Sequence, residues 1–258
     1  MTFNQAVNAP NTSQTGYVAP AGMGGAAGGN AGKPGQLLIT LSHVTVPVSR
    51  WQAEGNGNDS VGSNQGTLVN GVGFVTGRVG QAFSLDGYDD HVEIPDNVSV
   101  DRPSVTNALT LCAWVKWDGV AKPDLCPVLY KSIGYGATTN PWNTYQLAIT
   151  NAGSVYVSLS NGVANGEKAD VWSIATLTVG TWYHIAATYD GTNIKAYIDG
   201  LLVGTWPVNV HIGNREGPLF IGTNTEYAGG NHFGGQIDEP ALYDQALPIA
   251  EIREIAGL

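Results

Sequence analysis

Apolar and polar residues alternate from Thr176 to Thr205 around two Asp-Gly steps, at 190–191 and 199–200. Before the first step the side chains fall into two sets that point in opposite directions, Trp182, His184, Ala186 and Thr188 against Tyr183, Ile185, Ala187 and Tyr189. After it, one face carries Ile194, Ala196 and Ile198. Because Asp-Gly tolerates the positive φ angles of tight hairpin turns, the pattern predicts antiparallel strands in a meander with one buried face.

The same period of two predicts strands through most of the chain. We expect a strand at 109–117, with 128–132 as its hydrogen-bonded partner across the connection at 118–127. A hairpin is predicted to turn at 151–153 between two alternating arms. The remaining expected elements are strands at 172–177, 218–222 and 236–243, and a short helix at 249–255.

Five segments of the chain resemble, in the same order, those of the laminin-G-like, concanavalin A-like jelly-roll family. The most distinctive is Gly-x-Trp-x-His-x-Ala-x-x-Tyr-Asp-Gly at 180–191, followed by Tyr-x-Asp-Gly at 197–200. The others are Trp51–Asn56 with Asn64–Leu68, Val79–Ile94, Leu109–Lys116 and Gly235–Leu247. The resemblance covers residues 48–258 and implies an all-β fold, a two-sheet antiparallel β-sandwich of the jelly-roll type. It implies less about function, because this scaffold carries lectins, glycosidases, adhesion modules and virion proteins.

Residues 1–47 have a different composition from the domain that follows. They are rich in Gly and Ala, hold no Asp or Glu, and include a single Lys. Such a segment is typical of a flexible linker, or of an arm that a neighbouring subunit or a particle scaffold holds in place as an assembly strap. Residues 36–48 alternate like a strand, which predicts either the first strand of the sandwich or a strand added to a partner's sheet.

The charge balance narrows the class of partner. With 11 basic and 21 acidic residues the formal net charge is −10, which argues against nucleic acid and against an anionic membrane surface. No apolar run is long enough to span a membrane, and the first residues do not form a signal peptide. We therefore expect an extracellular or virion-surface protein, either with a processed or engineered start or released by lysis after cytoplasmic synthesis.

The sequence offers little to a catalytic hypothesis. Glycosidases of the resembled fold carry a Glu-x-Asp-x-x-Glu strand, and none of the eight glutamates here has Asp two positions later. The five histidines are scattered, and His184 is interpreted as structural. We expect no enzyme activity.

Calcium is a candidate cofactor, with a structural role, because it takes carboxylate and carbonyl oxygens from loops. One candidate cluster is Asp86, Asp89 and Asp90. The resemblance implies Asp238, in the Ile-Asp-Glu strand, as the best single ligand, with Glu54 or Asp59 joining it from the opening segment. The alternative is that Asp86 and Asp89 only hydrogen-bond the backbone of their turn.

Two loops combine aromatic and amide side chains, the mixture that stacks on sugars and hydrogen-bonds their hydroxyls. The candidate ligand-binding residues are Tyr135, Trp142, Asn143 and Tyr145 in one loop, and Tyr227, Asn231 and His232 in the other. The alternative is that these side chains pack beneath long loops. Trp114, Trp172 and Trp182 lie in predicted strands and are expected to be core residues.

The two cysteines, Cys112 and Cys126, lie on the strand at 109–117 and on the connection that follows it. An oxidising setting would allow them to cross-link, but the expected hairpin register does not bring them face to face. Two buried free thiols are the favoured interpretation.

Three function hypotheses follow. The first is a non-catalytic structural and adhesion protein of a particle surface, of the virion decoration or tail type, which binds neighbouring subunits or surface glycans. The second is a secreted carbohydrate-binding module, and the third, least supported, is a glycoside hydrolase. Assembly through residues 1–47 separates the first from the second.

Overall fold

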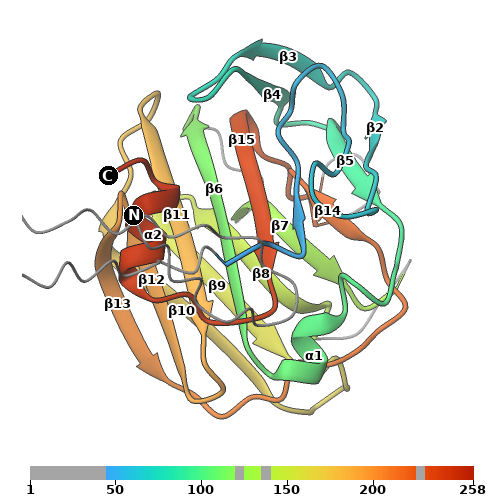
Figure 1. Ribbon diagram of the computed structural model, residues 1–258, viewed down its shortest axis with the longest axis vertical. Helices are drawn as coiled ribbons and strands as arrows, with labels where there is room; N and C mark the ends of the chain where they lie inside the picture. The colour runs from blue at the N-terminus through green and yellow to red at the C-terminus, as the bar shows by residue number, and fades with distance from the viewer. Residues whose placement is uncertain (1–44, 120–124, 135–140, 225–229) are drawn as a thin grey trace, which may run out of the picture. The chain divides into compact units, whose positions relative to one another are not determined.

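The computed structural model describes residues 45–119, 125–134, 141–224 and 230–258. Within these ranges the chain forms fifteen strands and two short helices, arranged as two antiparallel sheets face to face (Figure 1). The predicted all-β sandwich is confirmed.

The first sheet has eight described strands in the order β13-β12-β11-β6-β15-β4-β3, with β1 paired to β15. Their bounds are β1 Ser49–Arg50, β3 Gly73–Thr76, β4 Gln81–Asp86, β6 Leu109–Trp117, β11 Trp182–Tyr189, β12 Asn193–Ile198, β13 Leu201–Pro207 and β15 Gly234–Tyr243.

The second sheet has seven described strands in the order β10-β9-β8-β7-β14-β5-β2. Their bounds are β2 Thr67–Val69, β5 His91–Ile94, β7 Leu125–Ser132, β8 Asn143–Thr150, β9 Ser154–Ser160, β10 Lys168–Thr176 and β14 Leu219–Ile221. The helices are α1 Arg102–Thr106 and α2 Ile249–Ile255.

The hydrophobic core fills the space between the two sheets. Its largest fully buried side chains include Trp51, Phe83, Leu111, Leu147 and Tyr189. Each comes from the inward-facing set of an alternating strand or from a loop that closes the sandwich. Trp51 belongs to such a loop, and its indole nitrogen donates to the Asn64 carbonyl at 2.8 Å. Burial of these inward faces is what drives the two sheets together.

The meander predicted around the Asp-Gly steps forms β11, β12 and β13. Asp199 and Gly200 both have positive φ, 46° and 66°, so they make the two-residue hairpin turn that the dipeptide favours. At the first step only Gly191 has positive φ, and the Asp190 carboxylate accepts hydrogen bonds from the backbone of Thr192 and Asn193 instead.

The expectation of one buried face in this meander is wrong, because β11 is buried on both faces. Ile185, Ala187 and Tyr189 enter the core between the sheets, while Ala186 belongs to a second apolar cluster on the outer face. That cluster is closed by α2 and by the end of β15, and it consists of Cys112, Ala186, Tyr197, Ala241, Tyr243, Leu247 and Ile252. Alternation shows which residues share a face, but not that a distant helix covers it.

The predicted pairing of 109–117 with 128–132 is also wrong. Strand β6 lies between β11 and β15, whereas β7 lies in the opposite sheet between β14 and β8. The connection between β6 and β7 therefore crosses from one sheet to the other. As a result Cys112 faces the outer cluster and Cys126 faces the core, and both side chains are buried with no disulfide between them.

Other local predictions are confirmed at the level of the element. The hairpin of β8 and β9 turns at 151–153, and α2 spans the predicted residues. Of the three predicted core tryptophans only Trp114 is buried, because Trp182 is half-buried and Trp172 is 59% exposed on β10 at the edge of its sheet. Residues 1–44, most of the predicted N-terminal arm, lie outside the described residues. Among the helices described, none is long and apolar enough to cross a membrane.

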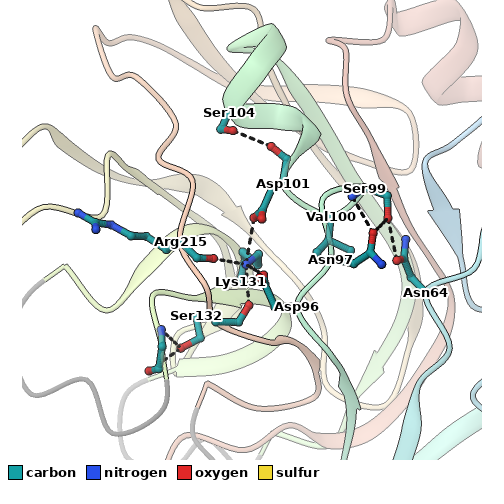
Figure 2. Close-up of polar contacts among 12 residues, drawn as sticks. Asn64, Asp96, Asn97, Ser99, Val100, Asp101, Ser104, Lys131, Ser132 and Arg215 are labelled. Atoms are coloured by element: carbon teal, nitrogen blue, oxygen red, sulfur yellow. Dashed lines mark hydrogen bonds and ion pairs between the residues drawn. The ribbon is translucent and has the colours of Figure 1, made fainter.

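A buried cation ties the loops to the seven-stranded sheet. Lys131, at the end of β7, is fully buried, and Figure 2 shows its ammonium surrounded by oxygen atoms. It is 2.7 Å from Asp96 Oδ1, 3.0 Å from Asp101 Oδ1, and donates to the carbonyls of Arg215 at 2.7 Å and Gly217 at 2.6 Å. Every ammonium proton has a partner, so we assign Lys131 a structural role.

Candidate ligand-binding face

A row of polar and aromatic side chains crosses the seven-stranded sheet from one edge to the other. The strand register places these residues directly opposite one another, from β10 to β2: Asp170, Ser158, Gln146, Tyr130, Phe220, Glu93 and Thr67. Residues opposite each other in an antiparallel sheet share a face. We call this set the polar row.

The polar row lies on the outer face of the sheet. The neighbouring residues along the same strands, Val171, Val157, Leu147 and Leu129, belong to the core between the sheets. Because successive side chains in a strand alternate between faces, the polar row points away from that core. The sheet therefore directs apolar side chains inward and polar or aromatic ones outward. Only the ends of the polar row are exposed, at Asp170 and Thr67, whereas Ser158, Gln146, Tyr130 and Phe220 are at most 3% exposed.

Ring contacts run along the middle of this outer face. Tyr130 and Phe220 stack with ring centroids 6.5 Å apart, and His91 meets Phe220 edge-on at 5.6 Å. His91 also lies 6.4 Å from the ring of His232, in the second predicted ligand loop. These contacts link strands β7, β14 and β5 to that loop.

Exposed aromatic surface lies at the β10 end of the row. Trp172 is opposite Tyr156, and the Tyr156 hydroxyl donates to Asp170 at 2.7 Å. Lys168 approaches the other oxygen of Asp170 at 2.8 Å. Burial by itself would raise the pKa of Asp170, but the hydrogen bonds from Lys168 and Tyr156 lower it below its usual value. Asp170 is therefore a charged acceptor at neutral pH.

Two side chains of β8 on this part of the sheet each have a buried polar atom with no hydrogen-bond partner in the described parts of the chain. These atoms are the Nε2 of Gln146, in the polar row, and the Oγ1 of Thr144. A buried polar atom left without a partner costs about 1–3 kcal/mol. Thr144 is 0% and Gln146 3% exposed, so both atoms lie beneath the surface of the outer face.

The structure separates the predicted ligand residues into two groups. Trp142 is 49% exposed, and its carbonyl accepts a hydrogen bond from Tyr130 at 2.5 Å, so it lies beside the polar row. Asn231 accepts from the backbone of Leu125 at the start of β7, and His232 approaches His91. All three therefore contact strands of the same sheet.

Asn143 and Tyr145 are buried. Asn143 donates to Ser158 Oγ at 3.1 Å, and the Tyr145 hydroxyl donates to the Val100 carbonyl at 2.8 Å inside the core. These two side chains hold the sheet rather than face a ligand. Tyr135 and Tyr227 lie outside the described residues.

The predicted metal ligands do not converge on one point. Carboxylate oxygens of Asp86, Asp89 and Asp90 lie within 4.8 Å of one another, the one such group of three found in the described parts of the chain. Asp86 Oδ1 accepts from the backbone of Tyr88 at 2.8 Å and of Asp89 at 3.3 Å, and Asp90 accepts from Gly71. The turn contacts of the alternative interpretation are thus present for Asp86, together with a spacing of the three carboxylates that suits a divalent cation.

The other predicted ligands serve different loops. Asp238 is fully buried and its Oδ2 accepts from the backbone of Arg78 and Val79, both at 2.8 Å. Glu54 Oε1 accepts from the backbone of Gln81 at 3.0 Å in the same turn. Asp59 accepts from four backbone amides of its own region, those of Arg50, Val61, Gly62 and Asn64.

Sequence reasoning missed most of the polar row. The alternation of 143–150 and 154–160 could have placed Gln146, Tyr156 and Ser158 opposite the apolar set. It could not align them with Tyr130 and Phe220, because that alignment depends on the order of strands from distant parts of the chain.

Comparisons with known proteins agree with this architecture. The family model described as the Concanavalin A-like lectin/glucanases superfamily matches residues 86–253. A search of curated proteins gives no match.

Among solved structures, one relative is domain 4 of AbnA, an extracellular arabinanase from Geobacillus stearothermophilus, in complex with arabinotriose. Its TM-score is 0.60 at 18% identity, and the match covers 81% of this chain and 98% of that one. The binding domain of Paraclostridial Mosquitocidal Protein 1 matches with a TM-score of 0.62 at 16% identity, over 81% of this chain and 51% of its own.

The binding domain of Botulinum neurotoxin DC, in complex with rat synaptotagmin II, matches with a TM-score of 0.59 at 12% identity. That match covers 82% of this chain and 51% of the toxin domain. The chain thus spans about half the length of each toxin binding domain, and at these identities the likeness concerns the fold.

Proposed function

This chain belongs to the concanavalin A-like lectin/glucanase superfamily, and on that premise we propose that it is a non-catalytic adhesion module that binds glycans on the outer face of its seven-stranded sheet. The observation that carries the proposal is the polar row. Its exposed β10 end places Asp170 beside the rings of Trp172 and Tyr156 on one face of the sheet.

The chemistry of that face suits a sugar. Trp172 and Trp142 offer half-exposed rings on which the apolar face of a sugar can stack. Asp170, exposed at the end of the row, is an ionised acceptor for the hydroxyl groups of the sugar. A few polar groups that fix orientation beside apolar surface are typical of small-molecule sites.

The spacing of carboxylates argues for binding rather than hydrolysis. Asp170 on β10 and Glu93 on β5 stand five strand steps apart in the sheet order. At about 4.8 Å per step their separation is roughly 24 Å. Glycosidase carboxylate pairs lie about 5–9.5 Å apart. These two acidic groups of the row therefore cannot act together on one glycosidic bond.

The solved relatives support a binding role without defining its ligand. One is an arabinanase domain in complex with arabinotriose, and two are toxin binding domains, one of them in complex with rat synaptotagmin II. We carry over to this chain only the class of function, binding at a surface.

We further propose that residues 1–47 attach the module to a particle, as in a virion decoration or tail protein. The Gly/Ala-rich, carboxylate-free composition of this segment favours attachment over an independent fold. Light scattering on the full chain and on residues 48–258 tests this proposal. Assembly confined to the full chain supports it, whereas two monomers favour the alternative, a secreted carbohydrate-binding module.

Glycan binding is tested with Trp142→Ala and Trp172→Ala on an array of immobilised glycans, with arabinotriose as a soluble probe. Both substitutions change exposed side chains, and Leu201→Ala, a 61% exposed position on the opposite sheet, is the matched control. Because an aromatic contact at the centre of an interface contributes about 2 kcal/mol or more, we expect at least a tenfold loss for each tryptophan variant and none for the control. Equal glycan binding by all four proteins would refute the proposal.

A further inference from the structure

A cavity lies on the opposite side of the sandwich from the polar row, on the outer face of the eight-stranded sheet. Its volume is about 300 Å³. The sheet provides Trp114, His184 and Tyr243, the segment before β1 provides Thr45 and Pro47, and α2 forms another wall. Because this face is separated from the polar row by the whole core, the cavity is independent of the proposed glycan site.

The floor of the cavity contains buried polar atoms without hydrogen-bond partners. His184 is 1% exposed and Glu239 is 9% exposed, and neither the Nδ1 of the histidine nor the Oε1 of the glutamate has a hydrogen-bond partner among the residues that the structure describes. The other oxygen of Glu239 accepts from Arg50 Nε. Glu239 therefore holds Arg50 with one oxygen and presents the other unused.

The backbone at Glu239 is held in an uncommon conformation. Its φ is +53°, and the register between β15 and β6 shifts between Asp238 and Ala241. A non-glycine residue in the left-handed region costs of the order of 1–3 kcal/mol, and such residues cluster at functional sites. The bulge directs this carboxylate into the cavity lining instead of continuing the ladder.

The cavity is acidic, with apolar walls. Glu239, Glu251 and Glu254 line it together with Arg50, and the guanidinium of Arg78 lies 4.6 Å from the centroid of the Trp114 ring. Val61 and Val79, 42% and 48% exposed, stand at its rim together with Ile255 of α2. Burial lowers the pKa of His184 to about 4, so the imidazole is neutral at pH 7 and adds no positive charge. A ligand that matches these walls carries a positive charge on an aliphatic stem.

We propose that this cavity binds a primary alkylammonium group, with Glu239 Oε1 as its principal acceptor. The ammonium donates to Glu239 and to the neutral His184, while its methylene stem lies against Val61, Val79 and Ile255. The group is either a free aliphatic amine or the side chain of a lysine in a partner protein. A divalent cation fits less well, because in the described residues no three carboxylate or imidazole groups around this cavity gather within 4.8 Å.

The experiment is a titration of the isotope-labelled full chain, followed by NMR shifts of the Trp114 and His184 side chains. The probes are n-pentylamine, Nα-acetyl-lysine methylamide and, as an uncharged control, 1-pentanol. We expect saturable shifts with both amines and none with the alcohol. Binding of pentylamine alone assigns the site to free amines, and binding of both extends it to lysine side chains.

Variants locate the site. Glu239→Gln keeps the shape of the side chain and should weaken amine binding by at least tenfold. Glu254→Gln, at an exposed rim position of α2, should weaken amine binding by about two- to fivefold. Because this position is exposed, the variant still tests the proposal if Glu239→Gln does not fold. Glu216→Gln, an exposed position outside the cavity, removes the same charge and should leave binding unchanged.

The proposal would be overturned if 1-pentanol shifted the same signals as strongly as pentylamine, or if Glu216→Gln weakened binding as much as Glu239→Gln. Absence of any shift with either amine would overturn it as well. The tryptophan variants of the glycan face should bind amines normally, so failure of one proposal is distinguishable from failure of the other.

Discussion

Replacing Lys131 by methionine should destabilise the domain strongly. Methionine keeps most of the length of the side chain but removes the ammonium, which leaves Asp101 without a cation in an environment where its side chain is 7% exposed. Removing one partner of a buried ion pair costs about 3–5 kcal/mol. Asp96 is 33% exposed, so solvent weakens its attraction to Lys131. We therefore assign the lost stability mainly to Asp101 and to the carbonyls of Arg215 and Gly217.

The assay is urea denaturation at pH 7, compared with Lys195→Met. Lys195 is 38% exposed and lies 4.0 Å from Asp190, so its removal should change the free energy of unfolding by less than about 1 kcal/mol. For Lys131→Met we expect a loss of about 3–5 kcal/mol. A domain of this size loses about 2–4 °C in melting temperature per kcal/mol, so the thermal shift should be about 10 °C.

The pH dependence provides an internal check. Burial raises the pKa of Asp101 above its usual value, although Lys131 acts in the opposite direction. Without Lys131 the folded-state pKa should rise further. With a raised folded-state pKa, the ionised carboxylate lowers the free energy of unfolding. This loss is absent below the unfolded-state pKa of about 3.9 and grows as the pH increases to the folded-state pKa. The deficit of the variant should therefore be smaller at pH 4 than at pH 7, and Asp101→Asn should recover part of it.

A deficit below about 1 kcal/mol, or one that is the same at both pH values, would refute the assignment of Lys131 as a buried structural cation. A deficit below about 1 kcal/mol would mean that the Lys131 ammonium is hydrated in solution rather than buried. A deficit that is the same at both pH values would mean that the loss comes from packing rather than from an unpaired carboxylate.

Three further predictions follow from buried and clustered groups. Burial raises the pKa of Cys112 to about 12 and of Cys126 to about 11, so a thiol reagent at pH 8 should label neither in the folded protein and both after denaturation. Calcium should raise the melting temperature relative to EDTA by occupying the cluster around Asp89, and Asp89→Asn should abolish that rise; an identical effect of calcium on both proteins would contradict it. Burial raises the pKa of Asp238 to about 6, so this carboxyl lowers stability as pH increases from about 4 to 6; Asp238→Asn should flatten that part of the stability profile measured by urea denaturation.

Much of the fold was predictable from sequence, because alternation is a local property. The two sets of side chains at 182–189 and the positive φ of Asp199 and Gly200 follow from residue type over a few positions. The resemblance of five ordered segments added the sandwich. Even there the local pattern misled in one respect, since it paired β6 with β7, two strands that lie in different sheets.

The candidate sites depended on tertiary structure. The exposed Trp142 was predicted, but the polar row takes Asp170, Gln146 and Phe220 from strands β10, β8 and β14, which are distant in sequence. The sequence alone determined which residues of a strand share a face, because side chains alternate between the two faces with a period of two residues. Which outward residues meet was decided by strand order and register, since hydrogen-bonded pairing between sequence-distant strands is a property of the whole sandwich.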